Sequence, residues 1–260
     1  MEIDGSDKQD LVRHFTDYIV GRNAVHEALR SGRAIDKVLI TKGQHSGSIN
    51  VLLSKCRDRG IPIKEIDSRK LESIAGSNHQ GIAAVAACKE YATLDDLFVN
   101  AKEKEEPPFF VVCDELEDPH NLGAILRTAD ATGVHGVIVP KRRSAGLTSA
   151  VYKASAGAVE YVPVARVSNI SDTLRELKKR GVWIYGMDMK GEAWCSTDLR
   201  GPMAIVIGSE GKGIGRLVGE QCDFTLSLPM LGSVSSLNAS VACGVLLYEV
   251  ARQRQRLTAF

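Results

Sequence analysis

The chain has 260 residues, of which 44% are hydrophobic and 25% charged, and its formal net charge is +1. This is ordinary globular composition, sufficient for one large domain or for a small and a medium one. The near-neutral charge excludes a polycation, so any nucleic-acid surface has to be local. No apolar run approaches the roughly 18 residues that span a bilayer, and residues 1–20 lack the apolar core of a signal peptide.

The six cysteines are not spaced as metal ligands or as a redox pair. Several lie in apolar runs, as buried free thiols do. This pattern fits a reducing compartment. We therefore expect a cytoplasmic protein with no metal and no membrane contact.

The N-terminal third is predicted to be a small α/β domain behind a tail. Residues 1–16 are polar and without period, which indicates a flexible tail. The pattern within residues 17–90 predicts helices over 23–29, 49–59 and 68–75 and strands over 35–40, 61–66 and 82–87.

A change in composition over residues 91–108 predicts a linker. Charged residues dominate this segment, and it ends in Pro107 and Pro108. Such a stretch is typical of a polar helix followed by a rigid connection. We place the domain boundary here.

Residues 109–260 alternate between strand and helix patterns, which predicts a mostly parallel sheet with helices on both faces. Strands are expected over 109–113, 137–139, 162–164, 183–187, 204–207 and 224–228, and helices over 121–132, 147–155, 171–180 and 237–254. Ligands of open α/β sheets bind at the carboxyl ends of the strands. Three loops at such positions are unusual.

The first loop follows the strand that ends at Cys113 and leads into a small, apolar helix. Asn121 could cap this helix, whereas Arg127 lies nearly two turns further on, on another face. From the residues alone, Arg127 is more typical of a surface or ion-paired side chain. His120 could equally be a loop polar group or a catalytic base.

The second loop, from Gly208 to Gly215, is rich in glycine. It is neither a Walker A loop nor a dinucleotide fingerprint. Glu210 at its centre would repel phosphate, but it could accept hydrogen bonds or face a cation. The alternative is a flexible turn without function.

The third loop, from Leu228 to Ser240, combines a proline, a glycine and a cluster of serines in front of the last helix. A helix entrance presents unpaired backbone N–H groups and the positive end of the helix dipole. A simpler interpretation is a helix cap at Ser235 or Ser236.

Taken together, six segments resemble the SPOUT class of methyltransferases, in its RNA 2′-O-ribose branch. Within that branch the chain is most similar to the bacterial enzymes that methylate a guanosine in the peptidyl-transferase region of 23S rRNA. The segments that carry the resemblance are Gly21–Leu29, His79–Ile82, Asn121–Asp130, Val137–Pro140, Gly208–Gly211 and Gly232–Asn238.

The resemblance implies more than the residue pattern shows. It implies a deep trefoil knot in the C-terminal domain, a homodimer with the active site at its interface, and RNA, most often rRNA, as the substrate. It implies S-adenosylmethionine as the cofactor and no metal. The N-terminal domain would bind RNA, and His79–Gly81 would either contact RNA or stabilise a turn.

The resemblance also assigns the cofactor site. Gly208, Leu228 and Leu237 would hold S-adenosylmethionine mainly through backbone groups, with glycine permitting a close approach. Met230 and Ser236 would be their neighbours.

The catalytic residues follow in the same way. Arg127 matches the family's catalytic arginine, and Asn121 the residue that supports it. Glu210 would orient Arg127 or the ribose, and Ser236 and Asn238 would complete the polar surroundings. Because a guanidinium stays protonated, Arg127 is expected to stabilise negative charge at the target phosphate or 2′-oxygen; activation of the hydroxyl is the alternative.

Three other functions are weighed against this one. A related enzyme of the same branch could methylate tRNA or another rRNA nucleotide. A non-enzymatic RNA-binding module is disfavoured by the complete set of polar site residues. A dinucleotide-dependent oxidoreductase is disfavoured because the glycine loop comes late in the chain.

Overall fold

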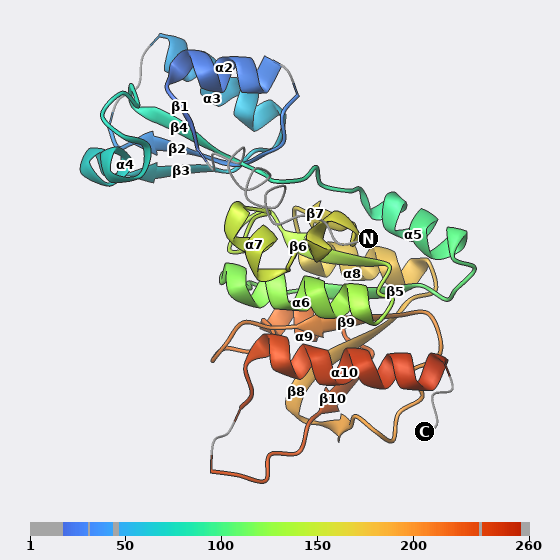
Figure 1. Cartoon of the computed structure of the whole chain (residues 1–260). Coiled ribbons are helices and arrows are strands. Elements are labelled where there is room, and N and C mark those ends of the chain that lie inside the picture. Colours follow the sequence, from blue (N-terminus) through green and yellow to red (C-terminus); the bar gives the residue numbers. More distant parts are fainter. Residues whose placement is uncertain (1–17, 31, 44–46, 234–235, 256–260) are drawn as a thin grey trace, which may run out of the picture. The chain divides into compact units, whose positions relative to one another are not determined.

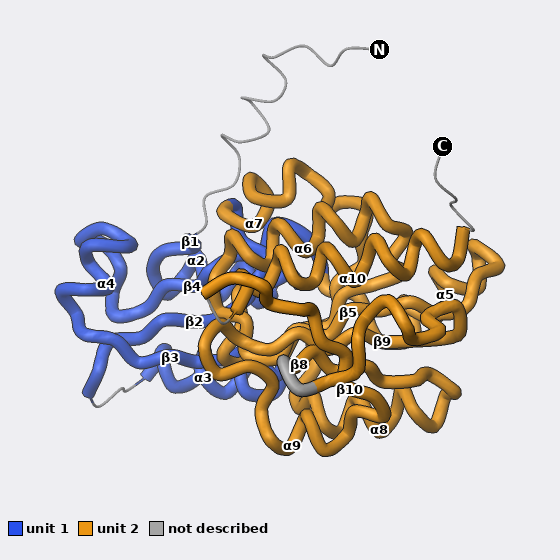
Figure 2. The backbone as a smooth tube through the Cα atoms, turned by 90° about the horizontal axis from the view of Figure 1, so that it is seen from below, with its two compact units in different colours: residues 1–90, 146–149 blue, residues 91–145, 150–260 orange. Residues whose placement is uncertain are grey.

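The computed structural model describes residues 18–30, 32–43, 47–233 and 236–255, so the predicted tail over residues 1–16 lies outside the described part. The chain divides into two compact units (Figure 2). Unit 1 comprises residues 1–90 with 146–149, and unit 2 comprises residues 91–145 with 150–260. The segment 91–108, interpreted from sequence as a linker, is thus assigned to unit 2.

Unit 1 contains a four-stranded mixed sheet in the order β1-β4-β2-β3. β1 and β2 are antiparallel to β4, and β3 is parallel to β2. The strands are β1 (Tyr18–Val20), β2 (Ile35–Thr41), β3 (Ile63–Ile66) and β4 (Ile82–Ala86). β1 was not predicted, because three residues are too few for a period of two to appear.

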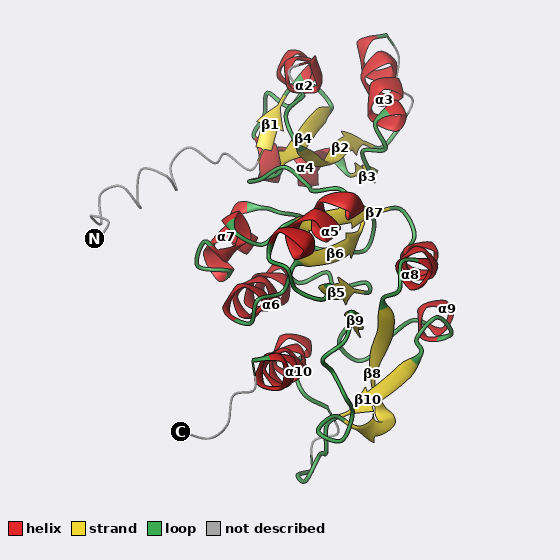
Figure 3. Ribbon diagram, turned by 90° about the vertical axis from the view of Figure 1, so that its right-hand side faces the viewer, coloured by secondary structure: helices red, strands yellow, loops and turns green. Residues whose placement is uncertain are grey.

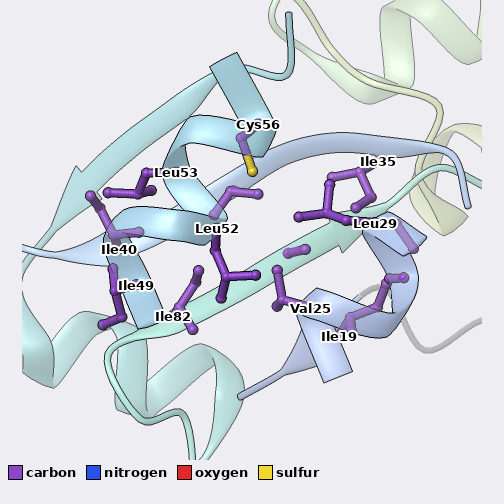
Figure 4. Close-up of a cluster of buried hydrophobic side chains, with 14 residues drawn as sticks. Ile19, Val25, Leu29, Ile35, Ile40, Ile49, Leu52, Leu53, Cys56 and Ile82 are labelled. Atoms are coloured by element: carbon purple, nitrogen blue, oxygen red, sulfur yellow. The ribbon is translucent and has the colours of Figure 1, made fainter. Parts of the chain in front are cut away.

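The helices of unit 1 cover both faces of this sheet. α2 (Arg22–Arg30) and α3 (Ser48–Asp58) pack on one face, where Val25, Leu52 and Ile82 belong to a buried cluster (Figure 4). α4 (Ser68–Ala75) packs on the other face around Leu71. The three helices start and end within a residue or two of the predicted ranges.

Unit 2 is built on six parallel strands in the order β10-β8-β9-β5-β6-β7. All of their carboxyl ends therefore lie at one edge, as predicted. The strands are β5 (Phe109–Cys113), β6 (Gly136–Pro140), β7 (Val164–Val167), β8 (Trp183–Ala193), β9 (Met203–Ile207) and β10 (Phe224–Ser227). The strand expected over 162–164 begins later, because a 3₁₀ helix occupies Ala158–Glu160.

Helices cover both faces of the parallel sheet (Figures 1 and 3). On one face, α5 (Leu94–Glu103), α8 (Ile170–Lys179) and α9 (Arg216–Gly219) share a buried cluster with alternate residues of the strands. On the other lie α6 (Pro119–Ala131), α7 (Ser149–Ala154) and α10 (Ala239–Arg254). Burial on both sides explains why β5 is a continuous apolar run.

Helix α5 shows why residues 91–108 are more than a connection. Thr93 and Asp96 form a capping box at its start, and the side chains of Leu97 and Ala101 are buried. A polar helix can still present one apolar stripe to a core. The deep trefoil knot implied by the resemblance remains a prediction.

A membrane-spanning helix would need a long apolar stretch. None of the helices in the described part of the chain has the length and hydropathy for this.

Candidate active site

Asn121 lies in the first turn of α6, just beyond the carboxyl end of β5. The cap of this helix is Asp118, whose Oδ1 accepts the His120 N–H at 2.9 Å, with Pro119 at the first helical position. The alternative that Asn121 caps the helix is therefore wrong. The Asp-Pro pair was the available signal, because proline is favoured directly after a cap. Asn121 is instead buried, with 4% of its surface exposed.

The glycine loop after β9 is a tight structure, not a flexible turn. Ser209 and Gly213 exchange two backbone hydrogen bonds of 3.1 and 2.9 Å. A methyl group on Gly208 would lie 2.1 Å from the Gly213 carbonyl carbon, so only glycine fits there. Gly211 and Gly213 have φ values of 81° and 66°, which favour glycine. The loop holds Glu210 at its exposed tip.

Asp114 fixes the far end of this loop and was not singled out from the sequence. Its buried carboxylate accepts the Gly215 N–H at 2.8 Å. Burial raises the pKa of Asp114, while the hydrogen bond from Gly215 lowers it. An acidic residue directly after a buried strand was the signal, since a buried carboxylate needs a donor.

Asn238 caps the last helix and also reaches into the site. Its Oδ1 accepts hydrogen bonds from the backbone N–H groups of Ser240 and Val241, at 2.9 and 3.2 Å. The interpretation of Ser235 or Ser236 as the cap is therefore wrong; Ser235 itself lies outside the described residues. A side-chain amide has both an acceptor and donors, so Nδ2 is left for a second function.

The three polar side chains converge in one hydrogen-bonded network. Glu210 Oε1 accepts from Asn121 Nδ2 at 3.0 Å and from Asn238 Nδ2 at 2.6 Å, and Asn238 Nδ2 also lies 2.8 Å from Asn121 Oδ1. Asn121 and Asn238 are 117 residues apart in sequence. Charge-assisted bonds to a carboxylate are stronger than neutral ones, so the network aligns the three loops. Glu210 Oε2 has no hydrogen-bond partner among the described residues and can receive a ligand.

Arg127 is not part of this network within one chain. Six residues separate it from Asn121, which places it about 9 Å further along α6 and about 120° around the helix. Its side chain is exposed and forms no hydrogen bond or ion pair with the described residues. His120 is exposed as well, and the one bond found for it comes from its backbone N–H.

Helices α6 and α10 run side by side in the same direction (Figure 1). Asn121 and Asn238 meet at their N-termini. One and a half to two turns later, a methyl group on Gly244 would lie 3.7 Å from Thr128 Cγ2. Arg127 therefore emerges beside the middle of α10.

The segment from Leu228 to Leu237 has the properties of a cofactor cradle. Its described residues form no backbone–backbone hydrogen bond with one another or with the rest of the described chain, so their N–H and C=O groups can bind a ligand. Leu228 and Met230 are half-buried, and Leu237 is 42% exposed. Ser236 is exposed, and its side chain forms no hydrogen bond with the described residues. Apolar side chains beside free backbone groups suit a neutral purine ring.

This donor set fits S-adenosylmethionine better than a nucleotide cofactor. The ligand carries no phosphate, and Glu210 at the loop tip would repel one. No group of three or more metal-ligating side chains occurs in the described part of the chain.

Comparisons with known proteins agree with this arrangement. The model of the SpoU rRNA Methylase family matches residues 108–248. A second family model, described as RNA 2′-O ribose methyltransferase substrate binding, matches residues 18–92. The two matches follow the division into unit 2 and unit 1.

Relatives and solved structures cover nearly the whole chain. A protein of Bacillus subtilis named as a TrmH family tRNA/rRNA methyltransferase, YacO, is 52% identical over 92% of this chain and 96% of its own. The SpoU methyltransferase AviRb from Streptomyces viridochromogenes, crystallised with AdoMet, is 27% identical, covers 92% of this chain and 90% of its own, and has a TM-score of 0.59. An AdoMet-bound rRNA methyltransferase from Sinorhizobium meliloti is 25% identical, covers 98% and 92%, and has a TM-score of 0.58.

Proposed function

Because the chain belongs to the SpoU family of RNA methyltransferases, which use S-adenosylmethionine (AdoMet), we propose that it methylates a ribose 2′-hydroxyl of ribosomal RNA. The observation that carries the proposal is the network of Asn121, Glu210 and Asn238, because it joins three loops at the carboxyl ends of the strands. A ligand held by two of the loops is thereby placed against the third.

The cofactor supplies an electrophilic methyl group on a sulfonium. In our proposal Gly208, Leu228 and Leu237 bind it through backbone groups, and Met230 and Ser236 flank it. Gly208 permits the close approach that the loop requires. A 2′-hydroxyl is a poor nucleophile at neutral pH, so alignment with the methyl group is the main task of the protein.

Glu210 serves this alignment. Its Oε1 accepts hydrogen bonds from the two asparagine amides, and its Oε2 forms no hydrogen bond with the described residues. A carboxylate oxygen held in this way accepts a hydrogen bond from a hydroxyl or an amine of the bound ligands. We propose that it orients the target ribose.

Arg127 acts on the developing charge. Since a guanidinium remains protonated, it donates hydrogen bonds to the target phosphate or 2′-oxygen and stabilises negative charge there. The proton of the hydroxyl leaves to the phosphate or to water. Arg127 must reach the network for this, and it does not do so within its own chain.

A homodimer solves this problem. One side of helix α10 carries the buried residues Cys243, Leu246, Leu247 and Val250. Its other side carries Val241, Val245 and Tyr248, which together with Leu237 just before the helix are 36 to 58% exposed. Their spacing of four, four and three residues makes one continuous apolar stripe. A helix that is apolar all round is typically buried, so we propose that a second copy covers the stripe. Arg127 emerges beside it and would enter the partner's site.

Ribosomal RNA is favoured over tRNA by chain coverage. The tRNA-modifying enzyme of A. aeolicus matches only 62% of this chain, although 85% of its own. The rRNA methyltransferase of Sinorhizobium meliloti matches 98%. An enzyme with a substrate-binding unit suits a structured target, and we propose a guanosine of 23S rRNA. As an RNA-modifying enzyme it would act in the cytoplasm.

Mapping of 2′-O-methyl groups at nucleotide resolution, in total RNA from cells with and without the protein, tests the proposal. We expect one rRNA position, a guanosine of 23S rRNA, to lose its methyl group and to regain it when purified protein and AdoMet are added. Loss at a tRNA position would favour the alternative substrate. No change in any RNA, together with no transfer of labelled methyl in vitro, would overturn it.

A further inference from the structure

The pair of helices on one face of unit 1 carries two polar links. Arg22 Nη1 donates to Ser48 Oγ at 3.3 Å, and Lys55 Nζ donates to His26 Nε2 at 3.0 Å. Arg22 and His26 are four residues apart on α2, and Ser48 and Lys55 are seven apart on α3, so each pair shares a face of its helix. The links therefore form two successive rungs between α2 and α3.

The turn before β4 holds the first rung in place. Arg22 Nε donates to the Gln80 carbonyl oxygen and the Arg22 N–H to Gln80 Oε1, both at 3.1 Å. Gln80 has a φ of 50°, which is unusual for a residue other than glycine. The neighbouring Gly81 N–H is bound by His79 Nδ1 at 2.9 Å. Residues His79–Gly81 thus stabilise a turn, and the turn positions a cation.

Both cations are held by neutral groups. The acceptors of Arg22 are amide oxygens and a hydroxyl, and that of Lys55 is an imidazole nitrogen. Neither side chain forms an ion pair with the described residues. The Glu27 carboxylate lies 3.5 Å from His26 Nδ1 and pairs with Arg30 at 2.9 Å, so Arg22 is the less compensated of the two cations. A fixed cation whose charge is not compensated is suited to bind an anion from solution.

The charge of residues 18–90, which form most of unit 1, agrees with this. Residues 18–90 carry twelve Lys and Arg against seven Asp and Glu, a net charge of +5, whereas residues 91–260 carry nineteen against twenty, a net charge of −1. Residues 1–17 carry two Lys and Arg against five Asp and Glu, so the near-neutral total conceals a basic segment over residues 18–90. Attraction of a polyanion would therefore be strongest there.

We propose that the Arg22 seam, defined as Arg22, His26, Ser48, Lys55 and the Gln80 turn, is where unit 1 binds the phosphate backbone of RNA. The inference rests on the proposed function, since RNA is the polyanion that an RNA methyltransferase must hold. The rungs are about 6 Å apart along α2, which suits neighbouring phosphates. Contacts of this kind fix orientation and carry no base sequence.

The test compares Arg22→Ala with Arg69→Ala in the full-length protein. Arg69 is exposed on α4, on the opposite face of the sheet, and forms no ion pair within the described part. Both variants lose one positive charge from the same unit. Binding to rRNA from cells lacking the protein is measured over a series of KCl concentrations, and AdoMet binding is measured in parallel.

For Arg22→Ala we expect RNA affinity to fall about tenfold and the slope of log K against log salt to decrease by nearly one. Arg69→Ala should stay within about twofold of wild type. AdoMet affinity should be unchanged in both. Lys55→Ala, which leaves the Gln80 turn intact, should reproduce the lower slope, so a folding defect in Arg22→Ala cannot imitate the result.

Equal losses in Arg22→Ala and Arg69→Ala would overturn the inference, because only bulk charge would then matter. So would wild-type affinity in both Arg22→Ala and Lys55→Ala. Failure of the proposed function looks different: the wild-type protein would then neither bind rRNA nor transfer a methyl group to any RNA.

Discussion

The two units position their polar groups in opposite ways. In unit 2 a carboxylate, Glu210, is the centre, and two neutral amides from distant loops fix it. In unit 1 a cation, Arg22, is the centre, and neutral acceptors from a neighbouring turn and helix fix it. Unit 2 carries a net charge of −1, whereas residues 18–90 of unit 1 carry one of +5.

From this difference we expect unit 1 to determine the affinity for RNA and unit 2 to align the reactants for methyl transfer. A long-range network aligns two reactants but adds little attraction for a polyanion, whereas a fixed, uncompensated cation does the reverse. Substitutions in the unit 2 network should therefore lower turnover with RNA affinity intact. Substitutions in the Arg22 seam should lower RNA affinity with AdoMet binding intact.

Arg127→Ala gives the largest expected effect. We expect kcat to fall by about 10³-fold, because the charge that develops in the transition state loses its donor. AdoMet binding should remain within about twofold. The measurement is transfer of labelled methyl to rRNA, with calorimetry of AdoMet binding. A variant that keeps most of its turnover would remove Arg127 from the chemistry.

Acid should weaken unit 2 through His135. This side chain is fully buried; Nδ1 accepts the Phe109 N–H at 3.1 Å, and Nε2 lies 3.2 Å from Glu106 Oε2. Burial, with smaller contributions from Lys104 and Arg254, lowers the pKa of His135 to about 4, although the Glu106 carboxylate acts in the opposite direction by attracting the protonated imidazole.

Unfolding of the protein in acid takes up a proton at His135, so a lower pH favours the unfolded chain. Between its ordinary value of 6.5 and about 4, His135 is protonated in the unfolded chain but not in the folded one. The contribution of His135 to the free energy of unfolding is therefore fully present above pH 6.5. It decreases by about 3 kcal/mol as the pH falls to 4. Denaturant unfolding followed by tryptophan fluorescence measures this, because Trp183 and Trp194 both belong to unit 2. If the unfolding free energy of His135→Gln fell with pH as steeply as that of the wild type, groups other than His135 would be responsible for the acid sensitivity.

Gly208→Ala should weaken AdoMet binding by about 30-fold, because a methyl group 2.1 Å from the Gly213 carbonyl carbon displaces the loop at a cost of about 2 kcal/mol. RNA affinity should not change. Gly201→Ala is the matched control, since a methyl group there meets nothing within 4 Å. Equal AdoMet affinity in the two variants would show that the loop does not contact the cofactor.

Asn238→Ser should have the smallest effect on turnover, about fivefold, from the loss of its amide donors. Serine retains the cap of α10, so thermal stability should be nearly that of wild type. Asn238→Asp also keeps the cap but brings a second carboxylate against Glu210, and should be slower than the serine variant. The reverse order would limit Asn238 to capping.

Much of the fold was predictable because its signals are local. The apolar run of β5 and the period of α3 follow from burial on known faces. The helix caps were not predictable, because several neighbouring residues have side chains that can cap a helix, and only the structure shows that Asp118 and Asn238 do so. The three-residue β1 exists only through its pairing with β4.

The sequence singled out Asn121, Glu210 and Asn238, and the structure brings these three side chains together. The roles that the resemblance assigned to them remain predictions. The sequence could not show that one Glu210 oxygen receives both amides, because that depends on the closed loop between Ser209 and Gly213. Asp114 and Arg22 could not be singled out from the sequence, because their hydrogen-bond partners, Gly215 and Gln80, lie 101 and 58 residues away.

A mixed-dimer assay tests most directly whether Arg127 serves the network of a second copy. Arg127→Ala and the double variant Glu210→Ala/Asn238→Ala are each nearly inactive by expectation, and are unfolded and refolded together in equal amounts. If Arg127 acts across a two-fold axis, one site of each mixed dimer is complete, and methyl transfer returns to about a quarter of the wild-type level. If Arg127 acts within its own chain, the mixture stays as inactive as its two components, and the account is wrong.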